Sequence, residues 1–320
     1  MASRLYNRTP LVYSWPISRS AGRHVYLKME TLQPTGSFKD RGLSKYINYL
    51  KEVKSARRII SSSGGNAGQA SAFVGKQLGL DVSVVVPETT PEPMIEKIKS
   101  HGAEVTVHGE SWKQADDLVH TMVEEDPDAQ YITPFDHPII FEGHSTLIDE
   151  VVEDWDEMPD VSGPPGAVVC CVGGGGLLTG IYQGLRKAGW HSTAVIAAET
   201  QGAASFSRSV KEGKLITLDR IATIASTLGA PKVTPTVIAH MHEHKAETHA
   251  IGDVTDREAV DSLKKFQKDH RVLVEPSCGA ALSMVYESRH ARLLPDTVIM
   301  VVCGGSGVDM DILRAWDEKV

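Results

Sequence analysis

Short runs of apolar, mostly β-branched residues alternate along the chain with longer segments that have the spacing of amphipathic helices. Turn-forming and polar residues separate these runs, which favours buried strands. Six runs are predicted as strands: 58–60, 82–86, 104–107, 167–172, 194–198 and 297–302. Strands that alternate with helices are typical of a parallel sheet, so the pattern predicts an open α/β fold covered by helices on both faces.

Capping residues mark where some of the helices begin. Thr90 before Pro91 predicts an N-cap followed by proline at the first helical position. Thr255 and Glu258 have the spacing of a capping box. Another helix is predicted over 69–78. The acidic segment 150–160 is interpreted as the solvated face of a helix.

The length of 320 residues, with 41% hydrophobic residues, suits one large domain or two of ordinary size. The spread of strands favours two α/β units, with a ligand bound beyond the carboxyl ends of the strands. The Gly-Pro-Pro-Gly segment at 163–166 is the most linker-like part of the chain, and a loop within one domain explains it equally well.

Charge and cysteine content narrow the range of partners. The net charge is −8, and Lys and Arg are not clustered as phosphate-backbone binding requires, so no nucleic-acid partner is expected. No membrane association is expected either, because no apolar stretch approaches roughly 20 residues and no signal peptide is evident. The same two absences predict a cytoplasmic protein. The four cysteines are too few and too widely spaced for a disulfide scaffold, which predicts reduced thiols, and they include no Cys-x-x-Cys pair to start a zinc site.

Four consecutive glycines, Gly173, Gly174, Gly175 and Gly176, stand between a predicted strand and a helical pattern that continues from Leu177. Successive glycines let backbone amides converge on an anion, and the helix N-terminus adds its dipole. The run lacks the Gly-Lys-Ser/Thr ending of a Walker A loop. It therefore predicts a phosphate site, with a flexible strand-to-helix turn as the alternative.

A second turn of this kind contains Ser62, Ser63, Gly64, Gly65 and Asn66, between the strand that ends at residue 60 and the next helix. Its hydroxyls and amides suit a carboxylate, because an anion at a helix N-terminus accepts several hydrogen bonds at once. A plain N-cap is an equally good interpretation of the same residues.

Two single residues, Lys39 and Cys303, lie next to turns and are also candidates for the site. Lys39 follows turn residues and Phe38, which suits a lysine at a helix start facing a cleft. A desolvated lysine has a lowered pKa and attacks carbonyl groups, although most lysines are solvated surface residues. Cys303 joins a buried strand to a third glycine-rich turn, where a lone cysteine is more often part of the core.

Together these segments resemble the fold-type II, or tryptophan synthase β, family of pyridoxal-phosphate (PLP) enzymes, and within it the serine/threonine dehydratases. The similarity runs over nearly the whole chain, and the matching segments are 37–39, 62–66, 141–144, 173–176, 275–281 and Cys303. The resemblance implies two open, mostly parallel twisted sheets covered by helices, with PLP in the interdomain cleft. It implies a large PLP-binding domain of 1–32 and 138–320, and a small domain of 33–137.

The resemblance also assigns roles to residues that bind the cofactor. Lys39 would hold PLP as a Schiff base and remove the Cα proton of the substrate. Phe38 would pack on the cofactor ring, Asn66 would bind its 3′-oxygen, and Cys303 would meet its pyridine nitrogen as a neutral partner. The phosphate would be bound by Gly173, Gly174, Gly175, Gly176 and Leu177.

The implied substrate is a small hydroxy-amino acid. L-Serine would give pyruvate and ammonia, and L-threonine would give 2-oxobutanoate and ammonia. The substrate would be bound by Phe135 and by Ser62, Ser63, Gly64, Gly65 and Asn66. Serine racemases of the family carry a serine where this chain has Gly64, so little racemisation is expected.

Glu199, with the backbone carbonyls of Ala203 and Leu228, matches the place where the family binds a monovalent cation such as potassium. The alternative for Glu199 is a carboxylate paired with a base. The resemblance further implies a homodimer, in keeping with the prevalence of twofold assemblies. Because the chain ends at Val320, the regulatory domain of biosynthetic threonine deaminases is not expected.

Rival interpretations remain open. Asp40 and Arg41 after the lysine are also similar to threonine synthases, although such an enzyme needs a second anion site for a substrate phosphate. A non-catalytic PLP-binding protein is another alternative. His240 and His244 lie one helical turn apart and could chelate a metal, but a solvated helix end is the favoured interpretation.

Overall fold

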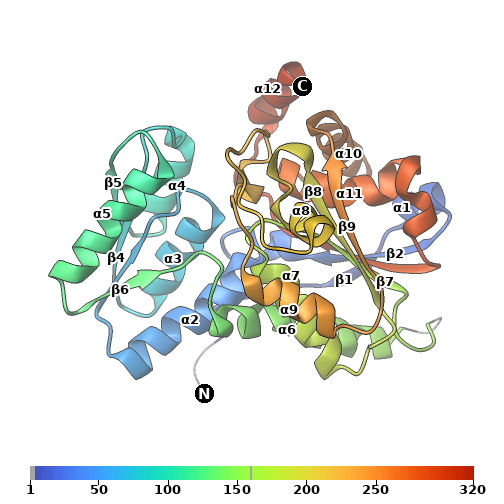
Figure 1. Ribbon diagram of the computed structural model, residues 1–320, viewed down its shortest axis with the longest axis horizontal. Coiled ribbons are helices and arrows are strands. Elements are labelled where there is room, and N and C mark those ends of the chain that lie inside the picture. Colours follow the sequence, from blue (N-terminus) through green and yellow to red (C-terminus); the bar gives the residue numbers. More distant parts are fainter. Residues whose placement is uncertain (1–3, 159–160) are drawn as a thin grey trace. The chain divides into compact units, whose positions relative to one another are not determined.

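The computed structural model describes residues 4–158 and 161–320 (Figure 1). The chain divides into two compact units, the first made of Gln33–His144 with the described residues up to Asn7, and the second of Arg8–Leu32 with the described residues of Ser145–Val320. The predicted domain boundaries differ from this division in two places. The described residues up to Asn7 belong to the first unit, and helix α6 (Pro138–Asp156) contributes residues 138–144 to it.

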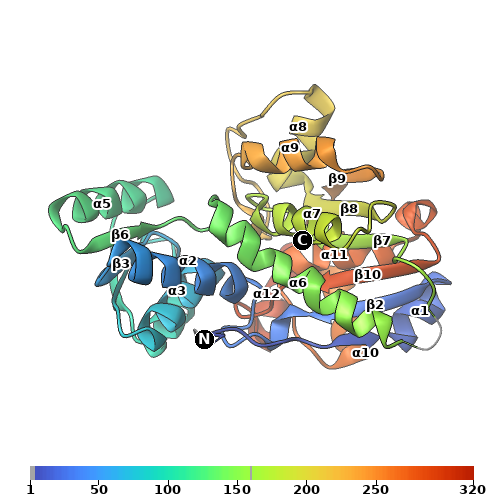
Figure 2. The ribbon, with the colours of Figure 1, turned by 90° about the horizontal axis from the view of Figure 1, so that it is seen from below.

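The first unit contains a four-stranded, fully parallel sheet in the order β5-β4-β3-β6. Its strands are β3 (Arg58–Ser61), β4 (Asp81–Val86), β5 (Glu104–Val107) and β6 (Ala129–Ile132). Its further helices are α2 (Lys39–Lys54), α3 (Asn66–Gln77), α4 (Glu92–Ser100) and α5 (Trp112–Glu125). Figure 2 shows α5 on one face of the sheet and α2 and α3 on the other.

Apolar side chains fill both faces of this sheet. Ile59 and Val84 pack on one face against α2 and α3, whereas Ile60 and Val85 pack on the other against α5. Neighbouring residues of one strand thus face opposite layers, as the twofold repeat of a strand requires. Both faces are apolar because helices cover both, which explains the continuous hydrophobic runs in the sequence.

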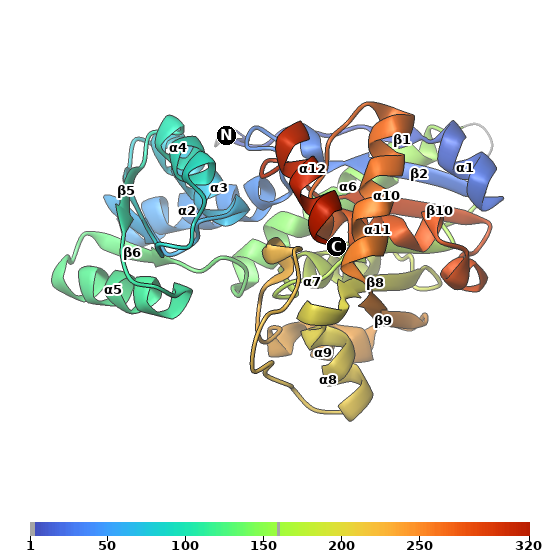
Figure 3. The same ribbon diagram turned by 90° about the horizontal axis from the view of Figure 1, so that it is seen from above.

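The second unit contains a six-stranded sheet in the order β1-β2-β10-β7-β8-β9, in which the β1–β2 pair is antiparallel and the other pairs are parallel (Figure 3). The strands are β1 (Leu11–Tyr13), β2 (His24–Met29), β7 (Ala167–Cys171), β8 (Ala194–Thr200), β9 (Thr248–Val254) and β10 (Thr297–Val302). Two mostly parallel sheets confirm the predicted α/β class.

Helices cover both faces of the second sheet as well. They are α1 (Trp15–Ala21), the later part of α6, α7 (Gly176–Lys187), α8 (Ser205–Glu212), α9 (Pro235–Glu243), α10 (Asp256–His270), α11 (Pro276–Tyr286) and α12 (Met310–Lys319), with the 3₁₀ turns η1 (Glu30–Leu32), η2 (Gln201–Ala203), η3 (Ser226–Leu228) and η4 (Ser288–Leu293). Figure 1 shows α10 and α11 on one face and α6, α7 and α9 on the other. No helix among the described residues is both long and apolar enough to cross a membrane.

The six predicted strands are all strands, and those at 104–107 and 297–302 have the predicted bounds. The capping box of Thr255 and Glu258 at α10 is confirmed. The predicted start of α4 is wrong, because Pro91 is extended with ψ 136° and is itself the N-cap, so the helix begins at Glu92. Thr90 belongs to the preceding turn, where its amide donates to the carbonyl of Pro87 at 2.9 Å.

Two further boundaries need correction. The helix predicted over 69–78 is α3, which begins three residues earlier, at Asn66, directly after its N-cap Gly65. In the acidic segment, α6 ends at Asp156, and residues 159–160 lie outside the described part of the chain. The interpretation of this segment as a solvated face is wrong for Glu150, which is buried and bonded to Lys28.

Candidate active site

The strand order of the first unit brings two loops together. From β3 the chain proceeds outward to β4 and β5, and β6 then returns to the other side of β3. Ligands of open α/β sheets bind beyond the carboxyl ends of the strands where the order reverses in this way. The segment 62–66, called the substrate turn from here on, follows β3, and Phe135 follows β6. Two predicted substrate-binding segments therefore lie side by side.

Lys39 is the first residue of α2 and its side chain is half-buried. Its Nζ donates a hydrogen bond of 2.6 Å to the carbonyl of Pro134, next to Phe135, and lies 5.3 Å from the ring centroid of Phe38. The turn before the helix is fixed by Asp40, whose carboxylate accepts from the amide and the hydroxyl of Thr35 at 2.8 and 2.6 Å. Lys39 is thus held at the loop that follows β6.

The substrate turn ends at Asn66, which begins α3 after Gly65 as its N-cap. A Cβ atom at Gly68 would lie 1.8 Å from the carbonyl oxygen of Ser63, so only glycine lets the helix approach the turn this closely. The amides of the turn lie at the N-terminus of a 12-residue helix, which favours an anion. Ser62 is buried and donates its hydroxyl proton to Asp116 at 2.6 Å.

His144 also lies close to Lys39, and the sequence indicates it only as part of the segment 141–144. Its imidazole is fully buried, and neither ring nitrogen has a hydrogen-bond partner among the described residues. The ring packs against Gly42, where a Cβ atom would lie 2.5 Å from its Cε1. Burial holds the pKa of His144 well below its usual range, and the charges of Lys39 and Arg41 lower it further. The ring is therefore neutral, and it meets Phe38 edge-on at 5.0 Å.

A second reversal of strand order lies in the second unit. There β7 is followed outward by β8 and β9, and β10 returns to the other side of β7. The segment 173–176, called the glycine turn, follows β7, and Cys303 follows β10. The two loops meet at the carboxyl edge of this sheet, as the contact of 3.4 Å between the sulfur atoms of Cys171 and Cys303 shows.

The glycine turn leads directly into α7. Gly175 is its N-cap at φ 89°, a conformation that glycine adopts without strain. The carbonyl of Gly174 accepts from the amide of Thr234 at 2.9 Å, and a Cβ atom at Gly173 would lie 3.3 Å from the carbonyl oxygen of Thr227. Amides at the start of a 12-residue helix form an anion site, and Leu177 is buried beside it.

Cys303 lies in a buried cluster of thiols. The hydrogen bond from Cys171 raises the pKa of Cys303 well above its usual range, and burial raises it further. The thiol of Cys278 on α11 is also hydrogen-bonded to Cys303. Nearby, Glu275 accepts from the hydroxyl of Thr227 at 3.0 Å and from the amide of Gly307 at 2.8 Å, which ties the loop after β10 to η3. The Cys303 sulfur is thus a neutral thiol at pH 7.

Glu199 is the last residue but one of β8 and is fully buried. Its two oxygens accept from the amides of Phe206 and Ser207 at 2.8 and 2.7 Å, at the start of α8. Burial raises the pKa of Glu199 to about 7. Ala203 lies in η2 and Leu228 in η3, and the Leu228 carbonyl accepts from the amide of Ala230 at 2.7 Å. The amides of α8 therefore already hold this carboxylate.

The two histidines near the end of α9 have separate partners. His240 Nδ1 lies 2.8 Å from Arg186, and His244 Nε2 lies 2.8 Å from the carbonyl of Thr193. Within 4–158 and 161–320, no group of three or more His, Cys, Asp or Glu side chains could hold a metal ion.

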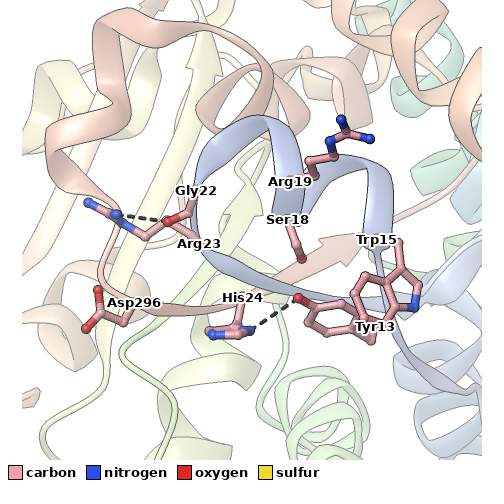
Figure 4. Close-up of a pocket in the computed structure, with 8 residues that line it drawn as sticks. All are labelled: Tyr13, Trp15, Ser18, Arg19, Gly22, Arg23, His24 and Asp296. Atoms are coloured by element: carbon pink, nitrogen blue, oxygen red, sulfur yellow. Dashed lines mark hydrogen bonds between the residues drawn. The ribbon is translucent and has the colours of Figure 1, made fainter.

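A pocket on the second unit lies apart from these residues. Figure 4 shows it between α1 and the strand β2, with Tyr13 and Trp15 in edge-to-face contact at 5.0 Å and Tyr13 Oη 3.2 Å from His24 Nδ1. Trp15 is 77% exposed, and none of the predicted site residues lines this pocket. This pocket therefore contains no candidate site residue of the second unit.

The chain is similar to known proteins over nearly its whole length. The family model described as "Pyridoxal-phosphate dependent enzyme" matches residues 2–304. The chain is 41% identical to the L-serine dehydratase/L-threonine deaminase of Mus musculus, over 97% of this chain and 94% of the relative. It is 39% identical to the L-serine dehydratase of Dictyostelium discoideum, over 96% and 90%.

Solved structures of two further proteins also superpose on nearly the whole of this chain. The structure of a fungal L-serine ammonia-lyase from Rhizomucor miehei superposes with a TM-score of 0.91 at 31% identity, over 99% of both chains. That of the processed form of threonine deaminase isoform 2 from Solanum lycopersicum superposes with a TM-score of 0.86 at 25% identity, over 98% of this chain and 83% of that one.

Proposed function

Since the chain belongs to the family of pyridoxal-phosphate dependent enzymes, we propose that it converts L-serine to pyruvate and ammonia, and L-threonine to 2-oxobutanoate and ammonia, by β-elimination. The observation that carries this proposal is the near full-length similarity to serine dehydratases and threonine deaminases. The enzyme is thus a lyase that acts on small hydroxy-amino acids.

The residues of the chain fit PLP. The glycine turn is a cradle in which a side chain at Gly173 would crowd the backbone of Thr227, and its amides suit a phosphate group. Lys39 offers a half-buried amine, and Cys303 offers a neutral thiol. When bound, PLP supplies an aldehyde that condenses with amines and a ring that accepts electrons released at Cα.

Lys39 binds the cofactor and afterwards serves as the base. Its Nζ is held by the carbonyl of Pro134 in a half-buried position. The freed amine then removes the Cα proton of the substrate. Phe38 would orient the cofactor ring through apolar contact, and Asn66 would donate to its 3′-oxygen.

The amides of Gly173, Gly174, Gly175 and Gly176 would hold the phosphate of the cofactor, with Leu177 as an apolar wall. Cys303 would lie beside the pyridine nitrogen. Because its thiol is neutral, it would not keep that nitrogen protonated as a carboxylate would, which would favour loss of the β-hydroxyl.

The substrate carboxylate is bound at the start of α3. The turn of Ser62, Ser63, Gly64, Gly65 and Asn66 would supply backbone amides at a helix N-terminus, where a carboxylate accepts several hydrogen bonds at once. Phe135, in the loop beside Lys39, provides an apolar contact for the small side chain. Gly64 supplies no acid or base on the opposite side of Cα, so little D-serine is formed.

A monovalent cation such as K⁺ is a further part of the proposal. Glu199 would supply its carboxylate, and Ala203 and Leu228 would supply backbone carbonyls. The support is that Glu199 is fully buried and has a pKa of about 7, so a nearby cation would be enough to ionise it at neutral pH.

The enzyme is further proposed to be a cytoplasmic homodimer that binds no nucleic acid and no membrane. All four cysteines are buried free thiols, which suits a reducing compartment. Light scattering on a sizing column gives the oligomeric state directly.

The substrate proposal is tested by a panel of amino acids. The purified, PLP-loaded protein is assayed for 2-oxo acid and ammonia with L-serine and L-threonine, and with D-serine and O-phosphohomoserine as controls. Product from both L-amino acids and none from the controls is expected. Threonine formed from O-phosphohomoserine would instead identify a threonine synthase, and bound cofactor without any product would identify a non-catalytic binding protein.

A further inference from the structure

A carboxylate that belongs to none of the predicted segments lies directly beneath the substrate turn. Asp116 is on α5, next to Ala115, which packs in the core between α5 and the sheet. One oxygen of Asp116, Oδ1, accepts from Ser62 Oγ at 2.6 Å and from Tyr131 Oη at 2.9 Å. Ser62 is 1% exposed, so this contact is sheltered from water.

The same carboxylate is fixed from its other side. Its second oxygen lies 3.5 Å from Nε2 of His120, one turn later on α5, and the His120 ring stacks on Tyr131 at 4.6 Å. Tyr131 lies on β6 and is paired in register with Ile60, two residues before Ser62. The position of the carboxylate is therefore set by the strand β6 and by the helix α5, which packs on the sheet.

The hydrogen bond to Asp116 decides what Ser62 can do. A serine hydroxyl has a single proton, and here it is donated to a carboxylate, so it is not available to a substrate carboxylate. The hydrogen bonds inside the turn are longer, 3.3 Å from the Ser63 amide to Ser61 Oγ and 3.4 Å from the Gly65 amide to Ser63 Oγ. A short bond to an ionised acceptor is stronger than these.

We propose that Asp116 is a positioning residue, which holds the Ser62 side chain inward so that the backbone amides of the substrate turn face the carboxylate of the amino-acid substrate. Tyr131 assists by holding the same oxygen. The inference rests on the proposed function, because that function is what assigns a substrate carboxylate to this turn. It changes the role of Ser62 from a hydroxyl donor to the substrate into an anchor.

The test compares Asp116→Ala, Asp116→Asn and Ser62→Ala with Asp117→Asn. Asp117 is the matched control, because it follows Asp116 on the same helix but is exposed and pairs only with Lys113 among the contacts described, at 2.9 Å. KM and kcat for L-serine are measured on PLP-loaded protein. The dissociation constant of glycine, which has no β-substituent to eliminate, is measured from the change in cofactor absorbance.

For Asp116→Ala and Ser62→Ala, KM and the glycine dissociation constant are expected to rise about tenfold, the loss typical of one charge-assisted hydrogen bond. Affinity for PLP and kcat should change much less. Asp116→Asn, which keeps an acceptor oxygen, should recover part of the loss, and Asp117→Asn should match the wild type. The double variant Asp116→Ala/Ser62→Ala should be no worse than either single change.

Wild-type KM and glycine affinity in both single variants would overturn the proposal, as would additive effects in the double variant. Equal losses in kcat, PLP affinity and thermal stability would also overturn it, since they would show a general structural role. The glycine titration keeps this test separate from the proposed function. If L-serine is not a substrate but glycine binding still depends on Asp116, the proposed function fails and the positioning role stands.

Discussion

At the scale of single residues, Gly64 shows how the space around a missing side chain limits chemistry. A Cβ atom there would lie 2.9 Å from both Cγ2 and Oγ1 of Thr90, and 3.4 Å from Val86. A serine at this position therefore needs Thr90 to move or to be shortened. The sequence comparison with racemases identified the position, but only the structure shows the neighbour that fills it.

Gly64→Ser alone is expected to impair pyruvate formation from L-serine, because the new side chain collides with Thr90. Combined with Thr90→Ala, which removes both contacting atoms, it should raise the ratio of D-serine to pyruvate about tenfold or more, since a positioned acid or base contributes at least about a hundredfold. Chiral chromatography of the reaction mixture measures this ratio. An unchanged ratio in a folded, PLP-loaded double variant would contradict the role given to position 64.

Glu199 links the candidate cation site to the pH dependence of stability. Its pKa is raised from 4.5 to about 7 by burial, so between pH 4.5 and 7 the folded protein holds a proton that the unfolded chain has lost. The free energy of unfolding should therefore fall as the pH rises through this range, by up to about 3 kcal/mol. Glu199→Gln should reduce this slope.

Potassium provides the decisive comparison for Glu199. Urea unfolding is measured from pH 5 to 8 in KCl and in tetramethylammonium chloride at equal ionic strength. If the carboxylate binds the cation, KCl should stabilise the wild type more at pH 8 than at pH 5, because only the ionised form binds. The same response in Glu199→Gln would remove Glu199 from the cation site.

At the scale of elements, β3, β4, β7, β8 and β10 were predictable because their short runs are mostly apolar and buried. The strand β5 was predicted from alternating β-branched residues, although it is a mostly exposed edge strand. β1, β2, β6 and β9 were not predicted. β1, β6 and β9 lie at sheet edges. β1 has only three residues, and β9 is mostly half-buried with polar residues among its apolar ones. β2 includes Lys28, which the sequence pattern marks as a surface residue although it is fully buried. Tertiary partners, not local sequence, explain these strands.

Lys28 also explains why the acidic part of α6 was misread. Its Nζ donates to the Thr9 carbonyl at 2.6 Å and to Glu150 at 2.8 Å, while the neighbouring Asp149 pairs with Lys187 at the surface. A run of acidic residues on a helix does not reveal which one turns inward. The buried pair joins β2 to α6 within the second unit.

Lys28→Met is expected to lower the free energy of unfolding by about 3 kcal/mol or more, because Glu150 is left buried without its cation. Lys28→Met/Glu150→Leu should recover much of this loss, since an apolar pair requires no desolvation of charge. Asp149→Asn is the matched control and should cost less than about 1 kcal/mol. Urea unfolding measures all three, and equal effects of Lys28→Met and Asp149→Asn would contradict the account.

At the scale of the whole molecule, the candidate site depends on strand order, which a sequence pattern does not contain. The substrate turn and Phe135 are about 70 residues apart in the sequence, so no local sequence pattern indicates that they are close. They lie close because they follow the neighbouring strands β3 and β6. Asp116, Tyr131 and His144 were missed for the same reason. No local signal distinguishes them from other polar residues on helices and strands, and their contacts form only in the folded unit.

This chain is proposed to eliminate the hydroxyl of L-serine through Lys39. The most direct measurement is the release of pyruvate from L-serine by the wild type, Lys39→Ala and Lys45→Ala, all incubated with PLP. Lys45 lies on the same helix, is 42% exposed and pairs with Glu142, so it serves as the control. The account predicts wild-type release with Lys45→Ala and a loss of more than about a hundredfold with Lys39→Ala, together with the absorbance of the lysine-bound cofactor. Comparable pyruvate release by Lys39→Ala would contradict it.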